Sequence, residues 1–157
     1  MKQEVASVGL DLAKNVFQVH AIAADGAVLI RRKLRRTEVI RFFAELPRCL
    51  VGMEACASAH HWARELMAIG HEVRLMPPAY VKPYVKRGKS DAADAEAICE
   101  AASRPAMRFC SIKTAEQQTL SALHRVRKSL IGQRTVATNQ IHGFLLEFGI
   151  SLPIGAA

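Results

Sequence analysis

The sequence has few cysteines, and their spacing matches no metal site. Its four cysteines stand far apart, with no C-x-x-C pair and no H-x₃-H motif after one. This pattern excludes the common zinc-binding motifs and a disulfide framework. Cys49, Cys56, Cys99 and Cys110 are therefore expected to be free thiols of a reducing compartment.

Long apolar runs are also missing. After Met1-Lys2-Gln3-Glu4 the chain enters an apolar stretch of about eight residues, which is too short for a signal peptide or a membrane span. Glycine-rich phosphate loops are absent too. This absence argues against the sugar kinase and actin-like ATPases, although they also place an aspartate after their first strand. We expect a cytoplasmic protein with no membrane partner.

Acidic residues are outnumbered by basic ones. Lys and Arg total 22 against 14 Asp and Glu, which gives a formal net charge of +8. Such an excess favours a polyanionic partner, nucleic acid first, although a solvated basic face is the alternative. Two blocks concentrate the positive charge: Arg31, Arg32, Lys33, Arg35 and Arg36, then Lys82, Lys86, Arg87 and Lys89.

Apolar patterning predicts an α/β domain over residues 1–110. Three antiparallel strands are expected within residues 5–34, with Asp25-Gly26 as a turn. The three strands are expected over residues 5–10, 16–23 and 27–34. Helices and strands then alternate along the chain. They are a helix over 38–46 capped by Thr37, a strand over 49–53, a helix over 58–69 closed by Gly70, a strand over 72–76 and a helix from Asp91. This order is that of the ribonuclease-H-like fold, a mixed sheet with flanking helices.

A long, coiled-coil-like helix is expected within residues 111–150. Thr114-Ala115-Glu116-Gln117 has the form of a capping box, and Gly149 and Pro153 end the pattern. The helix would be roughly 50 Å long, although Gly132 permits a break. A small sheet domain offers its apolar stripe no partner, so we expect a homodimer through residues 114–148. The stripe comprises Leu123, Val126, Leu130, Ala137, Ile141, Phe144, Leu145 and Phe148.

Two acids follow predicted strands. Asp11 ends the first strand in Gly9-Leu10-Asp11, and Glu54 ends the fourth in Gly52-Met53-Glu54. A carboxylate at the end of a buried strand is costly unless it is solvated, paired or bound to a metal. For either residue alone, an ordinary strand-to-loop acid is the alternative.

Two further acids open the helix after Ser90. Asp91 and Asp94 are three residues apart and therefore share one face of its first turn. Alternatively, Asp91 caps the helix and Asp94 only interacts with its dipole. Together with Asp11 and Glu54 they supply the oxygen ligands that two Mg²⁺ ions about 3.5–4 Å apart need around a phosphodiester.

Several segments make the chain resemble a known family over nearly its whole length. They are Gly9-Leu10-Asp11 through Lys14, Met53-Glu54-Ala55-Cys56, Ala59-His60-His61-Trp62-Ala63-Arg64-Glu65-Leu66, and Val81-Lys82-Pro83-Tyr84-Val85-Lys86 running to Asp91-Ala92-Ala93-Asp94-Ala95. The chain resembles the bridge-RNA-guided transposases of the 110 family of insertion sequences, whose amino-terminal catalytic domain is called DEDD or RuvC-like. Ala57 departs from the glycine that the family often has there.

The resemblance implies a bacterial transposase that acts on element ends and target DNA, guided by RNA. It implies that Asp11, Glu54, Asp91 and Asp94 bind the metals, and that the helix after Thr114 is a coiled coil that contacts RNA. The dimer expected from the apolar stripe could assemble further into a tetramer. The family also has a second domain with a nucleophilic serine, which would begin after Ala157. We therefore expect a fragment that is inactive alone in strand exchange.

Basic residues near these segments are the candidate nucleic-acid contacts, because phosphate is bound mainly by Lys and Arg. Tyr80 and Tyr84 are suited to stack on bases or, equally, to pack on the Pro77-Pro78 turn. The candidate phosphate contacts are Lys14, Lys82, Lys86, Arg87, Lys89, Arg125, Lys128 and Arg134.

Two other functions would use the same residues differently. A junction resolvase or a ribonuclease-H-type nuclease would use the same acids with a water nucleophile and no second domain. A non-catalytic dimerising module would use the acids as caps and the long helix as its functional part. Convergence of the four carboxylates in space would argue against the second alternative.

Overall fold

A mixed sheet organises the first of the two units into which the chain divides, Met1–Thr114 and Ala115–Ala157. The computed structural model describes residues 4–85 and 90–153. The sheet has five strands in the order β3-β2-β1-β4-β5, antiparallel from β3 to β1 and parallel from β1 to β5. Its strands are β1 (Val5–Asp11), β2 (Val16–Ala23), β3 (Val28–Arg35), β4 (Leu50–Glu54) and β5 (Glu72–Met76).

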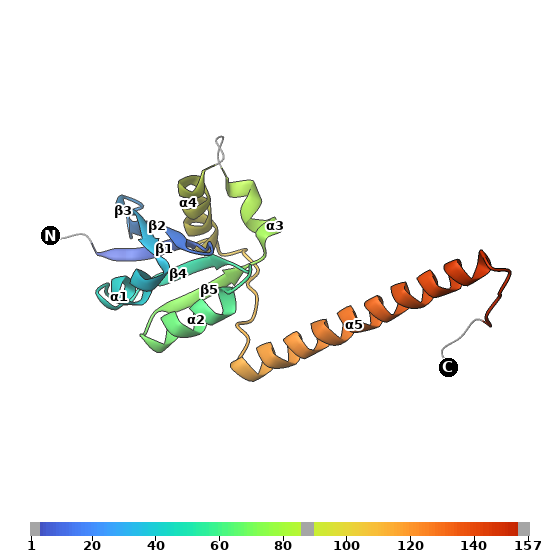
Figure 1. The fold of residues 1–157 in the computed structure, drawn as a ribbon. Helices are drawn as coiled ribbons and strands as arrows, with labels where there is room; N and C mark the ends of the chain where they lie inside the picture. The colour runs from blue at the N-terminus through green and yellow to red at the C-terminus, as the bar shows by residue number, and fades with distance from the viewer. Residues whose placement is uncertain (1–3, 86–89, 154–157) are drawn as a thin grey trace. The chain divides into compact units, whose positions relative to one another are not determined.

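Helices cover both faces of this sheet (Figure 1). One face carries α1 (Val39–Ala44), preceded by the 3₁₀ turn η1 (Arg36–Glu38), and α2 (Ala59–Ala68). The other face carries α4 (Asp91–Ala102), beside which lie α3 (Pro78–Val81) and the 3₁₀ turn η2 (Lys82–Tyr84). The sheet is therefore the middle layer of the unit.

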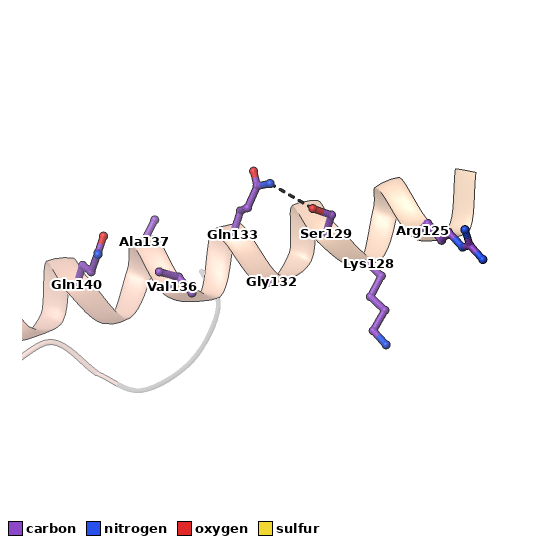
Figure 2. A pocket seen from close by; sticks show the side chains of 8 residues that line it. All are labelled: Arg125, Lys128, Ser129, Gly132, Gln133, Val136, Ala137 and Gln140. Carbon is purple, nitrogen blue, oxygen red and sulfur yellow. Dashed lines mark hydrogen bonds between the residues drawn. The ribbon is translucent and has the colours of Figure 1, made fainter. Parts of the chain in front are cut away.

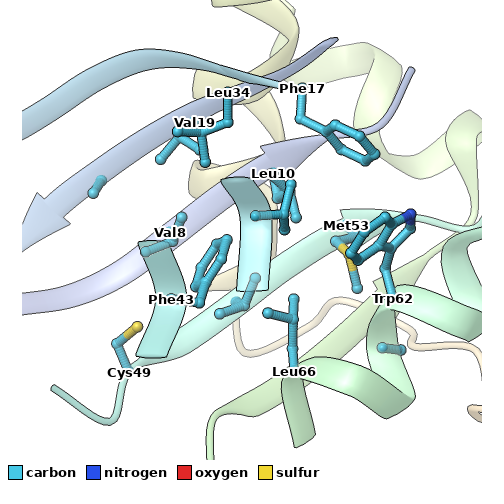
Figure 3. Packing of buried hydrophobic residues seen from close by; sticks show 14 of the residues in the cluster. Val8, Leu10, Phe17, Val19, Leu34, Phe43, Cys49, Met53, Trp62 and Leu66 are labelled. Carbon is cyan, nitrogen blue, oxygen red and sulfur yellow. The ribbon is translucent and has the colours of Figure 1, made fainter. Parts of the chain in front are cut away.

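The main core fills the α1 and α2 face (Figure 3). Alternate side chains of β1 and β2 point into it, as the period of a strand requires. Trp62 packs edge-on against Phe17, with ring centroids 5.1 Å apart. The core residues labelled in Figure 3 are Val8, Leu10, Phe17, Val19, Leu34, Phe43, Cys49, Met53, Trp62 and Leu66.

The opposite face of β1 and β4 carries glycines against which α4 lies. A Cβ atom added to Gly9 would clash with the backbone carbonyl of Ala95 and lie 2.6 Å from the Cys99 backbone nitrogen. One added to Gly52 would lie 2.5 Å from the Cβ of Ala102. The helix backbone thus approaches the sheet more closely than any side chain on these strands would allow.

The second unit consists mainly of α5 (Ala115–Leu146). This helix runs without interruption through Gly132, so the break that the sequence permits there does not occur. None of its residues is buried. After Leu146 the chain turns at Gly149, whose φ is +72°, so the predicted helix end is confirmed. No helix among the described residues is both long and apolar enough for a membrane span.

The structure confirms the predicted strands to within one residue at most ends, and it corrects two local predictions. Thr37 does not cap the first helix, because η1 already begins at Arg36 and Glu38 Oε2 accepts the Arg35 N–H at 2.6 Å. Residues 78–84, where the sequence pattern predicts no helix, form α3 and η2. Proline is the first residue of α3 and the second of η2, positions where its missing N–H would have no partner within the helix, so it does not prevent either helix. The four cysteines are free, as predicted.

Replacing Gly9 by alanine should displace α4 from the sheet. We expect a loss of about 3 kcal/mol, seen as a melting temperature lower by roughly 10 °C, because the obstructing atoms belong to the helix backbone. Thermal unfolding followed by circular dichroism measures it. The control is Gly132→Ala, where nothing lies within 4 Å and helix propensity favours alanine by about 1 kcal/mol. Unchanged melting of Gly9→Ala would contradict the close packing.

Candidate metal centre

Four acids come to one edge of the sheet from three elements. Asp11 is the last residue of β1 and Glu54 the last of β4, and these neighbouring strands run parallel, so both acids emerge at the same edge. Asp91 and Asp94 lie in the first turn of α4, which crosses β1. The predicted common location of the four acids therefore follows from strand direction and from the position of α4.

Three of these carboxylates form a tight cluster. Asp11, Asp91 and Asp94 each offer an oxygen, and these oxygens lie within 4.8 Å of one another. Glu54 is not part of this group, but it lies near enough for its charge to act on Asp11. The predicted convergence is confirmed for the three aspartates, and Glu54 lies at the periphery.

Asp91 does not cap the helix that it begins. The N-cap is Ser90, whose backbone is extended and whose Oγ accepts the Ala93 N–H at 3.3 Å. The alternative interpretation of Asp91 as the cap is therefore wrong. Because a serine takes this role, the carboxylate of Asp91 is left for the cluster.

Burial and the neighbouring carboxylates raise the pKa of two of the acids, Asp11 and Glu54. Burial raises the pKa of Asp11 from 3.8 to about 6, with further contributions from Asp94, Glu54 and Asp91, while a hydrogen bond from the Leu12 backbone opposes the shift. Burial, followed by the charge of Asp94, also raises the pKa of Glu54. A bound cation would remove this cost of ionisation, since it interacts favourably with every ionised carboxylate.

The surroundings of the cluster fit a hard metal ion. Gln18 pairs with Asp11 across β1 and β2 and is buried, and its Oε1 has no hydrogen-bond partner among the described residues. An unsatisfied buried oxygen needs a cation or a donor. The nearby thiol of Cys56 has its pKa raised by burial and by Glu54, so it stays protonated. An all-oxygen set of this kind suits Mg²⁺ or Mn²⁺ better than Zn²⁺.

Sequence reasoning had not singled out Gln18. Its only signal was a polar side chain within the apolar strand of residues 16–23, which also fits a residue facing solvent. The structure places it beneath α4 because it shares the sheet face of Asp11. Cross-strand register, which the sequence does not show, therefore distinguished the two interpretations.

The predicted phosphate contacts are all exposed where the structure describes them. Lys14 follows β1 and Lys82 lies in η2, both in the first unit. Arg125, Lys128 and Arg134 lie on α5. The remaining three predicted contacts, Lys86, Arg87 and Lys89, lie outside the described residues.

Comparison with known proteins shows the family to which the chain belongs. The sequence model of the DEDD transposases of IS110 insertion sequences, described as "Transposase", matches residues 8–150. The chain belongs to this family. Membership in the IS110 DEDD family confirms the predicted ribonuclease-H-like fold, with its 3-2-1-4-5 sheet and long carboxyl-terminal helix.

Curated relatives agree with the IS110 assignment. The chain is 57% identical over 146 residues to a probable family 20 transposase of Pseudomonas aeruginosa, a match that covers 93% of the chain and 43% of that protein. It is 50% identical to the transposase for insertion sequence element IS1328 of Yersinia enterocolitica, over 98% of the chain and 46% of the relative. It is 43% identical to the IS1111A transposase of Coxiella burnetii, over 98% and 42%. The chain thus spans less than half the length of these relatives.

The raised pKa of Asp11 predicts a pH-dependent stability for the metal-free chain. The contribution of Asp11 to the free energy of unfolding is fully present below pH 3.8 and is lost as the pH rises through about 6. The reason is that the folded chain disfavours the ionised carboxylate, whereas the unfolded chain does not. Asp11→Asn should therefore be more stable than the parent at pH 7 by about 1–2 kcal/mol, after allowance for solvent screening. Near pH 4 the difference should be small.

Urea unfolding in EDTA at both pH values measures this difference. Glu65→Gln, which changes an exposed acid on α2, is the control and should show no such gain. A parent chain more stable than Asp11→Asn at pH 7 would show that ionised Asp11 has a stabilising partner.

Proposed function

We propose that the chain is the metal-dependent catalytic domain of a DNA transposase that cleaves and transfers DNA strands in insertion-sequence transposition. The observation that carries this proposal is the cluster of Asp11, Asp91 and Asp94 at the sheet edge, with Glu54 beside it. Support comes from the family description and from relatives named as transposases of insertion sequence elements.

In this proposal the secondary structure holds each acid in place. Asp11 ends β1, which pairs with β2 on one side and β4 on the other, and Glu54 ends β4. Asp91 and Asp94 are held by a helix that Ser90 caps and that the glycine contacts fix on the sheet. Two bound Mg²⁺ ions would polarise the phosphodiester and activate the attacking oxygen. The protein contributes preorganised charge at fixed positions.

The nucleophile of strand transfer is proposed to be the family's serine, supplied by a second domain. Ser90, beside the cluster, is occupied in capping α4 through its Oγ. A nuclease that uses water is the competing function for the same acids. It predicts Mg²⁺-dependent DNA hydrolysis without transfer by residues 1–157 alone, lost in Asp11→Ala.

Metal binding should require the aspartate cluster. Millimolar Mg²⁺ or Mn²⁺ should raise the melting temperature of the parent chain by roughly 3 °C or more, because it stabilises only the folded state. Asp94→Asn should abolish most of this increase. The matched control is Glu116→Gln, which removes a first-turn acid from α5. Equal responses to the metal in Asp94→Asn and the parent would refute a metal site at the cluster.

Nucleic acid is the proposed partner of the exposed basic residues. In the first unit Lys14 follows the Asp11 strand directly, and on α5 Arg125 and Lys128 lie one turn apart. We propose DNA contacts for the first unit and contacts with a guide RNA for α5. The family resemblance supports the RNA part, because it implies an RNA-contacting coiled coil.

Affinity for DNA and RNA should fall steeply with salt. Between about 50 and 200 mM salt we expect a loss of about 10²-fold, because several phosphates are contacted. Lys82→Glu and Lys128→Glu should each weaken binding to unrelated sequences alike and reduce the salt slope by about one. Arg48→Glu is the control, since Arg48 precedes β4 and lies at the sheet edge opposite Glu54. Salt-independent binding would argue against phosphate contacts.

Self-association through α5 is the third part of the proposal. Its apolar side chains are exposed, among them Leu123 at 61%, Leu130 at 58% and Phe144 at 68%. Figure 2 shows the middle of the helix, where Gln133 Nε2 donates to Ser129 Oγ at 3.2 Å and Gly132 adds no bulk. An exposed stripe of this length is typical of a helix that packs on another copy.

Leu130→Glu should convert the proposed dimer to a monomer, since the carboxylate would be buried in the helix interface. Asn139→Glu, outside the apolar stripe of α5, should leave the mass unchanged. Light scattering of the purified chain gives the mass. A monomeric parent chain would refute self-association through this helix.

A further inference from the structure

A second concave surface lies apart from the acidic cluster. It is a hollow of about 330 Å³, within the range of small-ligand sites in proteins. Two tyrosines and an arginine are among its lining residues, and among the described residues no carboxylate lines it. The lining residues are Ala79, Tyr80, Pro83, Tyr84, Ala106, Met107 and Arg108.

The floor of the hollow is fixed by packing. Tyr84 and Met107 are partly buried against a second core on the α4 face, which includes Val81 and Ile98. The guanidinium of Arg104 lies 5.9 Å from the centre of the Tyr84 ring, and this cation–π contact also restrains the ring. Tyr84 is therefore a fixed surface, and the hollow exists before any ligand arrives.

Tyr80 forms the open wall. It lies on α3 next to the fully buried Val81, which anchors the helix, yet 45% of Tyr80 itself is exposed. In the described part of the chain Tyr80 has no aromatic or cation–π partner. Its ring is thus free to stack on a planar ligand.

Positive charge surrounds this aromatic wall. Lys82 follows α3 directly and Arg108 lines the hollow, while Arg104, over the floor, is ion-paired with Glu100. An apolar protein segment would gain nothing from these cations, whereas a nucleotide offers a flat base to the tyrosine and a phosphate to the rim. The charge pattern favours a nucleic-acid strand over a peptide.

The acidic cluster and the hollow lie toward opposite ends of α4. Asp94 lies in the first turn of this helix and Arg104 just after its end, which corresponds to about 15 Å of helical rise. A nucleic-acid strand covers this distance in roughly four to five nucleotides. A DNA strand held at the metals could therefore reach Tyr80.

We propose that this hollow binds an unpaired base of the DNA strand, stacked on Tyr80 with its phosphates on Lys82 and Arg108. This inference rests on the proposed function, since it takes the DNA at the acidic cluster as its source. It adds a base-stacking site to the phosphate contacts described above.

The test uses residues 1–157 and a short single-stranded DNA that carries 2-aminopurine, whose fluorescence is quenched on stacking. Tyr80→Ala should relieve the quenching and weaken binding about 5- to 100-fold, and Tyr80→Phe should stay within about twofold of the parent. An oligonucleotide with an abasic position in place of the fluorescent base should bind the parent and Tyr80→Ala equally. Unchanged melting temperatures would show that both variants fold.

The outcomes separate this inference from the proposed function. Weakening by Lys82→Glu with no effect of Tyr80→Ala would overturn base stacking and leave phosphate binding intact. An equal loss of affinity of Tyr80→Ala for intact and for abasic DNA would overturn base stacking as well. Stronger quenching with an RNA of the same sequence would also overturn the proposal, because RNA would then be the occupant. No binding of DNA by the parent chain would overturn both proposals.

Discussion

The contact between the α4 backbone and the glycines of the two central strands determines the geometry of the acidic cluster. Gly9 and Gly52 lie beneath the helix at positions where any side chain would push it away. Because α4 lies so close, its first turn brings Asp91 and Asp94 to the end of β1, where Asp11 lies. The same contact involves the buried Cys99 and Ala102 of α4, so helix packing and site formation depend on one another.

This close packing has an electrostatic cost. Burial first, and then the charges of the neighbouring carboxylates, raise the pKa of Asp11, whose oxygen lies within 4.8 Å of those of Asp91 and Asp94. The fold tolerates the repulsion because the strands and the capped helix are held by other interactions, chiefly the core on the α1 and α2 face. A cation among these carboxylates would offset the repulsion, because it interacts favourably with each ionised group.

The two units differ in what stabilises them. The first has two hydrophobic cores and long-range strand pairing. The second is a single helix with no buried residue, so its apolar side chains contribute little until another surface covers them. Within the first unit the hollow beside Tyr80 has a buried part and an exposed part. Its floor packs against the second core, while its wall, Tyr80, is exposed.

The sequence alone predicted the five strands, the longer helices and the acids at the ends of β1 and β4. Alternating apolar residues, the Asp25-Gly26 turn and Gly70 are local signals, and each acts through its own backbone or its nearest neighbours. The tertiary structure decided which residues meet. Only strand register places Gln18 opposite Asp11, and only the approach of α4 brings Asp91 and Asp94 to Asp11. That Ser90 caps α4 in place of Asp91 is a local contact, but the sequence pattern alone does not choose between the two. The short helices α3 and η2 were missed for the same reason, since they are stabilised by burying Val81 and Tyr84 against α4, a contact that no local pattern encodes.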